Sequence, residues 1–160
     1  MQNRRPIHRI MFVCHGNICR STMAEFVMKD LVKRADLEGD FVIASSATSS
    51  EEIGNDTYPG TKRVLSEHGV SFSPRAAVQL RAADYDAYDL FVGMDAANIR
   101  NMRRMLKGDP AAKVHKLLEF AEGSDTDAAA DVADPWYTGD FETTYDDVLR
   151  GCEALLAWLR

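Results

Sequence analysis

The sequence contains little cysteine and no long apolar run. Only three of its 160 residues are cysteines, and two of these, Cys14 and Cys19, lie in one loop. Such a set is a poor disulfide framework and indicates a reducing compartment, so we expect a cytoplasmic protein. No stretch approaches the roughly 18 apolar residues of a membrane span, and Arg4 and Arg5 precede no apolar signal-peptide region. We therefore expect no membrane partner.

The chain also lacks an excess of positive charge. Its 19 lysines and arginines stand against 25 acidic residues, which gives a formal net charge of −6. Nucleic-acid binders usually present a basic face, so we expect no nucleic-acid partner. The four histidines are dispersed without the spacing of metal ligands, and the sequence predicts no metal site. The length favours a single domain over residues 1–160.

Segments with strand-like and helix-like patterns alternate along the chain. The predicted strands span residues 9–13, 41–44, 89–93 and 113–117, and the predicted helices span 22–34, 57–67, 96–106 and 141–159. This alternation implies parallel strands joined by right-handed crossovers. We expect an α/β three-layer sandwich in which helices flank a central four-stranded parallel sheet with flavodoxin-like winding. Ligands of such sheets bind beyond the carboxyl ends of the strands.

Local patterns indicate where the helices end and which side they bury. Apolar residues recur at four-residue spacing in the first helix, at Met23, Val27 and Leu31. Ser21 or Thr22 can cap that helix, and Thr22 with Glu25 fits a capping box. His68 and Gly69 end the second helix. In the last helix, the residues expected on the buried side are Val148, Leu155 and Leu159.

One tight loop joins the first strand to the first helix, and it reads Val-Cys-His-Gly-Asn-Ile-Cys-Arg-Ser from residue 13 to residue 21. A loop that feeds a helix N-terminus directs backbone N–H groups inward, and the helix dipole adds partial positive charge, which together form an anion site. Gly16 allows a close approach of the backbone. Arg20 carries a planar fork that can hold two oxygens of a phosphate. The loop lacks the lysine of a nucleotide P-loop.

Cys14 would lie at the floor of this anion site. Thiolate is the nucleophilic form of cysteine, and helix N-termini and nearby cations stabilise it. The same donors that hold a phosphate would therefore create the nucleophile that attacks it. The plainer interpretations are a small core cysteine and a solvated arginine. Zinc bound by Cys14 and Cys19 is a further alternative, but the sequence has no second pair of ligands at the usual spacing.

Residues 13–21 resemble the signature loop of the low-molecular-weight protein tyrosine phosphatases, and the similarity covers nearly the whole chain. The other segments that carry the resemblance are Met23-Ala24-Glu25, residues 45–49, Ile53-Gly54, His68-Gly69, residues 91–95, Asp134-Pro135 and Phe141-Glu142. The resemblance implies a phosphotyrosine phosphatase I-like fold. It also implies hydrolysis of phosphotyrosine and aryl phosphate monoesters through a cysteinyl-phosphate intermediate, without a cofactor.

The family resemblance also implies partners and residue roles. A phosphotyrosine-containing protein is the expected substrate and inorganic phosphate the product; a cognate tyrosine kinase would be a further partner, but the sequence does not identify one. Cys14 would be the nucleophile, Arg20 the clamp on the phosphate oxygens, and Asp134 the general acid and then the base. The rest of the phosphate-binding loop would be His15, Gly16, Asn17, Ile18, Cys19 and Ser21. The residues expected to support Asn17 are Ser45 and His68. The residues expected at the pocket rim are Glu51, Trp136 and Tyr137.

Some of these roles have open alternatives. Ser21 can donate to the Cys14 thiolate or cap the following helix. Cys19 resembles a neighbouring cysteine that forms a reversible disulfide, or it is a small buried residue. Cys152 is expected in the core.

Three positions depart from the family pattern. Glu51, followed by Glu52, stands where the family usually carries a bulky residue at the pocket mouth. These carboxylates would repel a dianionic substrate, favour a substrate with basic flanking residues, or remain solvated rim charges. Thr22 replaces a proline, and Val78 replaces an arginine.

Three other functions compete with phosphotyrosine hydrolysis. A phosphoarginine phosphatase tends to carry threonine where Ile18 stands. A thiol-dependent arsenate reductase needs further cysteines near the middle of the chain, and none lies between Cys19 and Cys152. A non-catalytic phosphate-binding module is disfavoured because the nucleophile, the clamp and the acid are all present.

Overall fold

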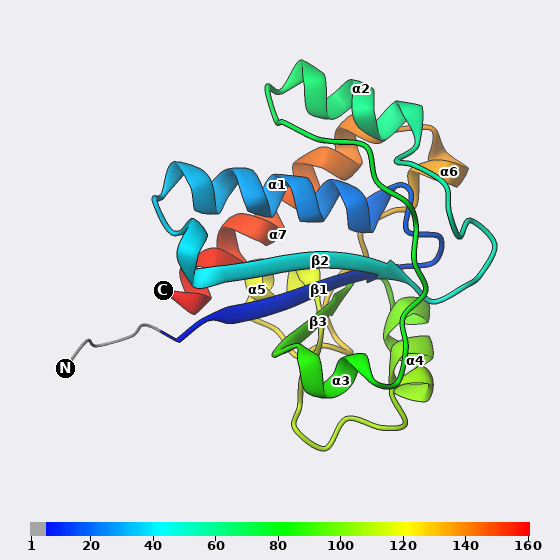
Figure 1. Cartoon of the computed structure of the whole chain (residues 1–160), viewed down its shortest axis with the longest axis vertical. Helices are drawn as coiled ribbons and strands as arrows, with labels where there is room; N and C mark the ends of the chain where they lie inside the picture. The colour runs from blue at the N-terminus through cyan, green and yellow to red at the C-terminus, as the bar shows by residue number, and fades with distance from the viewer. Residues whose placement is uncertain (1–5) are drawn as a thin grey trace.

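The computed structural model describes residues 6–160, and its four strands form one sheet (Figure 1). The strands are β1 (His8–Cys14), β2 (Phe41–Ala47), β3 (Leu90–Gly93) and β4 (Val114–Lys116). The helices are α1 (Arg20–Arg34), α2 (Pro59–Glu67), α3 (Asp84–Ala87), α4 (Ala96–Met105), α5 (Leu117–Glu122), α6 (Pro135–Thr138) and α7 (Phe141–Leu159), with a 3-10 helix at Glu38–Asp40.

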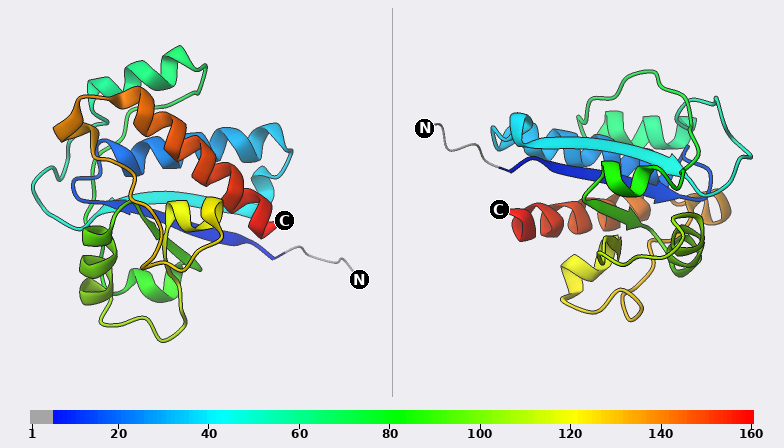
Figure 2. Two further views of the ribbon diagram at one scale, coloured as in Figure 1. Left: turned by 180° about the vertical axis from the view of Figure 1, so that it is seen from behind. Right: turned by 60° about the horizontal axis from the view of Figure 1, so that its bottom comes forward.

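All strands of the sheet are parallel, and their order is β2-β1-β3-β4. Helices α1, α5 and α7 pack on one face of the sheet, and α3 and α4 pack on the other (Figures 1 and 2). The predicted α/β fold with a four-stranded parallel sheet is confirmed. The register sets Cys14 of β1 beside Ala47 of β2, and Val13 beside Gly93 of β3. The loops that follow these strands therefore leave the same edge of the sheet.

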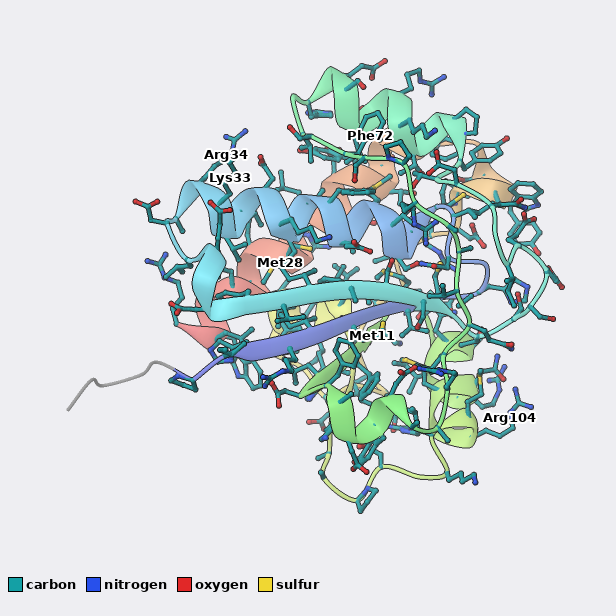
Figure 3. All side chains as sticks on the ribbon, viewed as in Figure 1. Met11, Met28, Lys33, Arg34, Phe72 and Arg104 are labelled. Carbon is teal, nitrogen blue, oxygen red and sulfur yellow. The ribbon has the colours of Figure 1, made fainter. Side chains whose placement is uncertain are left out.

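The alternation of side chains along β1 supplies both layers of the core. Ile10 and Phe12 are fully buried on the side of α1 and α7, whereas Met11 and Val13 pack toward α4. Figure 3 labels Met11 on the α4 side of the sheet and Met28 of α1 on the other side. Each such side chain contributes about 1.5–3 kcal/mol by leaving water. The central strand is thus held on both faces, which anchors the loop that follows it.

The contact between α5 and α7 depends on a glycine. A Cβ added to Gly151 would collide with Cγ of Leu117, which leaves no room for a side chain. Helix α7 also buries Val148 and Leu155 completely and Leu159 partly, as the sequence predicts. The close fit makes α7 a firm support for the loop that precedes it.

Several element boundaries differ from the sequence prediction. Leu117, predicted as the end of a strand, is the first residue of α5, because Glu119 accepts the N–H of Lys116 and starts a helix. Helix α2 starts at Pro59 rather than at residue 57, since the residue before a proline is held in an extended conformation. The sequence did not predict the short helices α3, α5 and α6. Among residues 6–160, no helix is both long enough and apolar enough to cross a membrane.

Candidate active site

The predicted phosphate-binding loop lies between the end of β1 and the start of α1. Helix α1 begins earlier than predicted, so Ser21 and Thr22 lie inside its first turn. Within the described chain no side chain caps α1. The predicted capping box of Thr22 with Glu25 is wrong, because the hydroxyl of Thr22 donates to the carbonyl of Cys19 instead. The N–H groups of the first turn therefore remain available to donate to an anion bound in the loop.

Cys14 lies at the floor of the loop, with 3% of its surface exposed. Its Sγ is 3.1 Å from Ser21 Oγ and accepts a 3.3 Å hydrogen bond from the N–H of Asn17. Ser21 thus contacts the sulfur and does not cap the helix. Among the described residues, no acceptor takes the N–H groups of Gly16 and Ile18. These donors are free to bind an oxyanion held over the sulfur.

Asn17 braces the loop. It is fully buried and has a φ of 59°, a left-handed conformation that costs a non-glycine residue about 1 kcal/mol. Its Nδ2 donates to Ser21 at 2.8 Å and to Ser45 at 2.9 Å, and its Oδ1 accepts the N–H of Val78 at 3.1 Å. The contact expected between Ser45 and Asn17 is present. These bonds hold the strained residue so that its N–H meets the sulfur of Cys14.

Arg75 supplies further support, which sequence reasoning missed. It lies between α2 and α3, and its guanidinium donates to the backbone carbonyl of Asn17 at 2.7 Å and also to Asn17 Oδ1. Its own N–H donates to Asp56 at 3.2 Å. Burial lowers the pKa of Arg75, although the negative charges of Glu25 and Asp56 oppose that shift. No local signal marks this arginine, because its contact with Asn17 spans 58 positions of the sequence.

The predicted support of Asn17 by His68 is wrong. Nε2 of His68 is 2.6 Å from Oε1 of Glu142, and the imidazole ring stacks on Tyr145 with the centroids 3.9 Å apart. Both partners belong to α7, so His68 joins the end of α2 to α7. Arg75 occupies the supporting position that was expected for this histidine.

Arg20 is 2% exposed and is held by its ionic and carbonyl partners. Its Nη1 donates to Asp95 Oδ2 and to the carbonyl of Val132, both at 2.8 Å, and its Nη2 lies 3.4 Å from Asp134 Oδ2. Burial by itself would lower the pKa of the guanidinium, but the negative charges of Cys14, Asp95 and Asp134 raise it above its usual value. Arg20 therefore stays charged in a fixed orientation.

Asp95 was not predicted as a site residue, although its position offered a signal. It lies just beyond the end of β3, after Met94, at the edge of the sheet where the phosphate-binding loop lies. One carboxylate oxygen accepts the N–H of Asn98 at 2.8 Å and caps α4, and the other orients Arg20. A carboxylate at the carboxyl end of a neighbouring strand stands where ligands of such sheets bind.

Asp134 reaches the loop from the segment before α6, which lies at the same end of the sheet (Figure 1). Pro135 is the first residue of α6, and Oδ1 of Asp134 accepts the N–H of Trp136 at 3.0 Å. The second carboxylate oxygen faces Arg20. Val132 anchors this segment, because its carbonyl also binds Arg20. The predicted acid and the predicted clamp are therefore adjacent.

These elements enclose a cavity of about 360 Å³. The residues that line it are Cys14, His15, Gly16, Ile18, Cys19, Arg20, Glu51, Glu52, Asp134, Trp136 and Tyr137. The residues predicted for the rim are all among them. Trp136 and Tyr137 form an exposed aromatic part of the wall, and Trp136 packs edge-on against Tyr58. Glu51 stands in the same wall, 3.0 Å from Nε2 of His15.

The other two cysteines are poor nucleophile candidates. Burial, together with the negative charges of Cys14 and Asp134, raises the pKa of Cys19 to about 12. Burial also raises the pKa of Cys152, which is fully buried in the core as predicted. All three cysteines are free thiols. Over residues 6–160, no group of three or more His, Cys, Asp or Glu side chains is arranged to hold a metal ion.

A thiol at the floor of an anion site, at the carboxyl edge of a parallel sheet, is the arrangement that a cysteine-dependent phosphatase requires. The comparison with protein families agrees with this class. A family model described as low molecular weight phosphotyrosine protein phosphatase matches residues 9–160. The chain belongs to this family.

Individual relatives match over most of their length. The low molecular weight protein-tyrosine-phosphatase YfkJ of Bacillus subtilis is 40% identical over 148 residues, which are 92% of this chain and 93% of YfkJ. PtpA of Staphylococcus aureus, also named a low molecular weight protein-tyrosine-phosphatase, is 35% identical over 153 residues, covering 94% of this chain and 92% of PtpA. The crystal structure of YfkJ superposes with a TM-score of 0.90 at 39% identity, covering 98% of this chain and 97% of that one. The crystal structure of DARP, a Drosophila arginine phosphatase, superposes with a TM-score of 0.82 at 27% identity, covering 94% of this chain and 97% of that one.

Proposed function

We propose that this chain hydrolyses phosphotyrosine and aryl phosphate monoesters with Cys14 as the nucleophile. The observation that carries the proposal is the position of the Cys14 sulfur. It lies at the floor of the cavity, in contact with the N–H of Asn17 and with the hydroxyl of Ser21. The N–H donates to the sulfur, and the hydroxyl, which accepts from the thiol, can turn to donate to a thiolate. The sulfur therefore lies at the floor of the anion site, as in-line attack on a bound phosphate requires.

In the first step, the thiolate of Cys14 attacks phosphorus, and an S–P bond forms while the bond to the tyrosine oxygen breaks. Asp134 gives its proton to the departing oxygen, and such protonation typically accelerates a reaction by about 10²–10⁴-fold. Arg20 and the loop N–H groups stabilise the charge on the other phosphoryl oxygens. Arg20 suits this role because Asp95 and Val132 already hold its orientation.

In the second step, water attacks the phosphorus of the cysteinyl-phosphate, and the carboxylate of Asp134 takes a proton from that water. The S–P bond breaks, the thiolate returns, and inorganic phosphate leaves. The hydroxyl of Ser21, 3.1 Å from the sulfur, stabilises the thiolate as it departs. Side chains and backbone of the protein supply every group in this cycle, so the proposal includes no cofactor.

The cycle requires a reduced sulfur at Cys14. All three cysteines are free, and a reducing compartment keeps cysteines in that state. We therefore propose a cytoplasmic location. We also propose that residues 1–160 form a single domain and that the substrate is a phosphotyrosine-containing protein.

Phosphoarginine is the second candidate substrate, because the fold is shared with a relative that is named an arginine phosphatase. One residue of the cavity argues against it. Ile18 lines the cavity where the family resemblance leads us to expect threonine in a phosphoarginine phosphatase. A branched apolar side chain offers a surface to a flat aryl ring and no hydrogen bond to a guanidinium.

A direct comparison of substrates tests the proposal. We expect hydrolysis of p-nitrophenyl phosphate without added metal and at the same rate in EDTA. Among matched peptides that carry phosphotyrosine, phosphoserine or phosphoarginine, kcat/KM for phosphotyrosine should be higher by about tenfold or more. A higher kcat/KM for phosphoarginine would show that the protein is a phosphoarginine phosphatase. The absence of phosphate release from every substrate would refute the proposal.

Replacing Arg75 with alanine should slow catalysis although Arg75 does not touch the reacting atoms. The Arg75→Ala variant loses the charge-assisted hydrogen bonds that hold Asn17 in its strained conformation. The Asn17 N–H then moves away from the Cys14 sulfur. We expect kcat/KM for p-nitrophenyl phosphate to fall by about tenfold, and the affinity for inorganic phosphate to fall with it. Arg75→Lys should recover only part of the loss, because lysine lacks the planar fork.

Arg63→Ala is the matched control for Arg75→Ala. Arg63 is an exposed arginine of α2, and its ion pair with Glu67 is 3.8 Å long. We expect kcat/KM of the Arg63→Ala variant for p-nitrophenyl phosphate to equal that of the unmodified protein. If Arg75→Ala kept full activity and full phosphate affinity, Arg75 would not be a positioning residue.

A further inference from the structure

The wall of the active-site cavity carries two kinds of side chain. Trp136 and Tyr137 form its aromatic part, and Glu51 and Glu52 form its acidic part. Both glutamates belong to the loop after β2, and the end of β2 pairs with the end of β1. The two carboxylates therefore stand beside the phosphate-binding loop and form part of the entrance that a substrate must pass.

Specific contacts keep each glutamate at this entrance. Oε2 of Glu51 is 3.0 Å from Nε2 of His15, a residue of the loop itself. Glu52 accepts a 2.6 Å hydrogen bond from the side-chain amide of Asn55. The stem of Glu52 also packs over the loop, since a Cβ added to Gly16 would lie 3.4 Å from Glu52 Cγ. His15 of the phosphate-binding loop thus holds the carboxylate of Glu51, and Asn55 holds the carboxylate of Glu52 beside that loop.

No lysine or arginine among the described residues balances the charge of these glutamates. Within residues 6–160, neither of them pairs with a lysine or an arginine; Glu51 meets a histidine and Glu52 meets an amide. The side chain of Glu51 is 69% exposed, so its charge faces solvent at the entrance. The floor of the same cavity carries Arg20 and the loop N–H groups. The cavity therefore carries hydrogen-bond donors for an anion at its floor and carboxylates at its entrance.

We propose that Glu51 and Glu52 select phosphotyrosine substrates in which lysine or arginine is next to the phosphotyrosine. The inference rests on the proposed function of the site. When the phosphate reaches the floor, the neighbouring residues of the peptide remain at the entrance, where they meet the two carboxylates. A basic neighbour is attracted there, and an acidic neighbour is repelled. The same two side chains therefore favour peptides with basic flanking residues and reject peptides with acidic ones.

The size of the effect follows from the exposure of the entrance. Charges a few ångströms apart in a largely solvated setting interact moderately, and added salt screens them. Exchanging a basic for an acidic neighbour should therefore change kcat/KM by about tenfold at low ionic strength. The change should lie in kcat/KM more than in kcat, because the flanking charge acts on association and not on the reacting atoms.

Three phosphotyrosine peptides test the proposal, identical except that lysine, alanine or glutamate stands on both sides of the phosphotyrosine. The unmodified protein should prefer lysine over glutamate by about tenfold in kcat/KM, with alanine between them. The preference should shrink below about threefold in about 0.5 M NaCl. In the Glu51→Gln/Glu52→Gln variant it should approach one at low salt, because glutamine keeps the hydrogen bonds and loses the charge.

The matched control is Glu38→Gln/Glu153→Gln, which changes the net charge equally at exposed positions outside the cavity. This variant should keep the preference of the unmodified protein. A preference near one in the unmodified protein, or a preference that survives in Glu51→Gln/Glu52→Gln, would overturn the proposal. Since p-nitrophenyl phosphate has no flanking residue, failure to hydrolyse it would count against the proposed function instead.

Discussion

Cys14→Ser should lower kcat for p-nitrophenyl phosphate by more than about 10³-fold while the variant still binds inorganic phosphate. A serine hydroxyl stays protonated at neutral pH and is a poor nucleophile in this site. The groups that hold the phosphate, Arg20 and the loop N–H groups, are unchanged by the substitution. Phosphate release measures the loss of turnover, and a rise of Tm with added phosphate measures the binding that remains.

Cys152→Ala is the matched control for the loss of a thiol. Cys152 is fully buried in the core, far along the chain in α7. Its replacement should lower the free energy of unfolding by roughly 1 kcal/mol and leave kcat unchanged. Substantial turnover by Cys14→Ser would show that another group is the nucleophile. If phosphate no longer raised Tm in Cys14→Ser, the sulfur would be needed for the shape of the anion site as well.

Asp134→Asn should slow reactions with poor leaving groups far more than reactions with good ones. The asparagine keeps the shape of the side chain and can still accept the N–H of Trp136, but it has no proton to give. For phenyl phosphate we expect kcat/KM to fall by about 10²–10³-fold, because the departing phenolate needs that proton. For p-nitrophenyl phosphate, whose phenolate is stable, the loss should be about tenfold or less.

Asp131→Asn is the control on the same segment. Asp131 is a half-exposed carboxylate paired with Lys116 at 3.0 Å, and it does not line the cavity. We expect both kcat/KM values to match those of the unmodified protein. Equal losses for phenyl phosphate and p-nitrophenyl phosphate in Asp134→Asn would contradict its role as the general acid.

Local patterns were sufficient for the main elements of the fold and insufficient for the short ones. The stripe of Met23 and Val27 predicted the buried side of α1, since a helix face repeats within a few residues. Helix α5 was missed because an apolar pair that begins at Leu117 fits the end of a strand as well as the start of a helix. The hydrogen bond that the N–H of Lys116 donates to Glu119 decided between these alternatives. Helix α6 spans Pro135–Thr138, which is too short to show a helical period.

The sequence by itself determined where the phosphate-binding loop lies, because Cys14, Gly16 and Arg20 fall within a short segment between a predicted strand and a predicted helix. Only the tertiary structure decided which side chains hold that loop in its active shape. Asp95 meets Arg20 across 75 positions, and Arg75 meets Asn17 across 58. Resemblance suggested His68 for this supporting role, yet His68 packs on α7. Contacts at such separations depend on how the whole core packs, and no local pattern of residues encodes them.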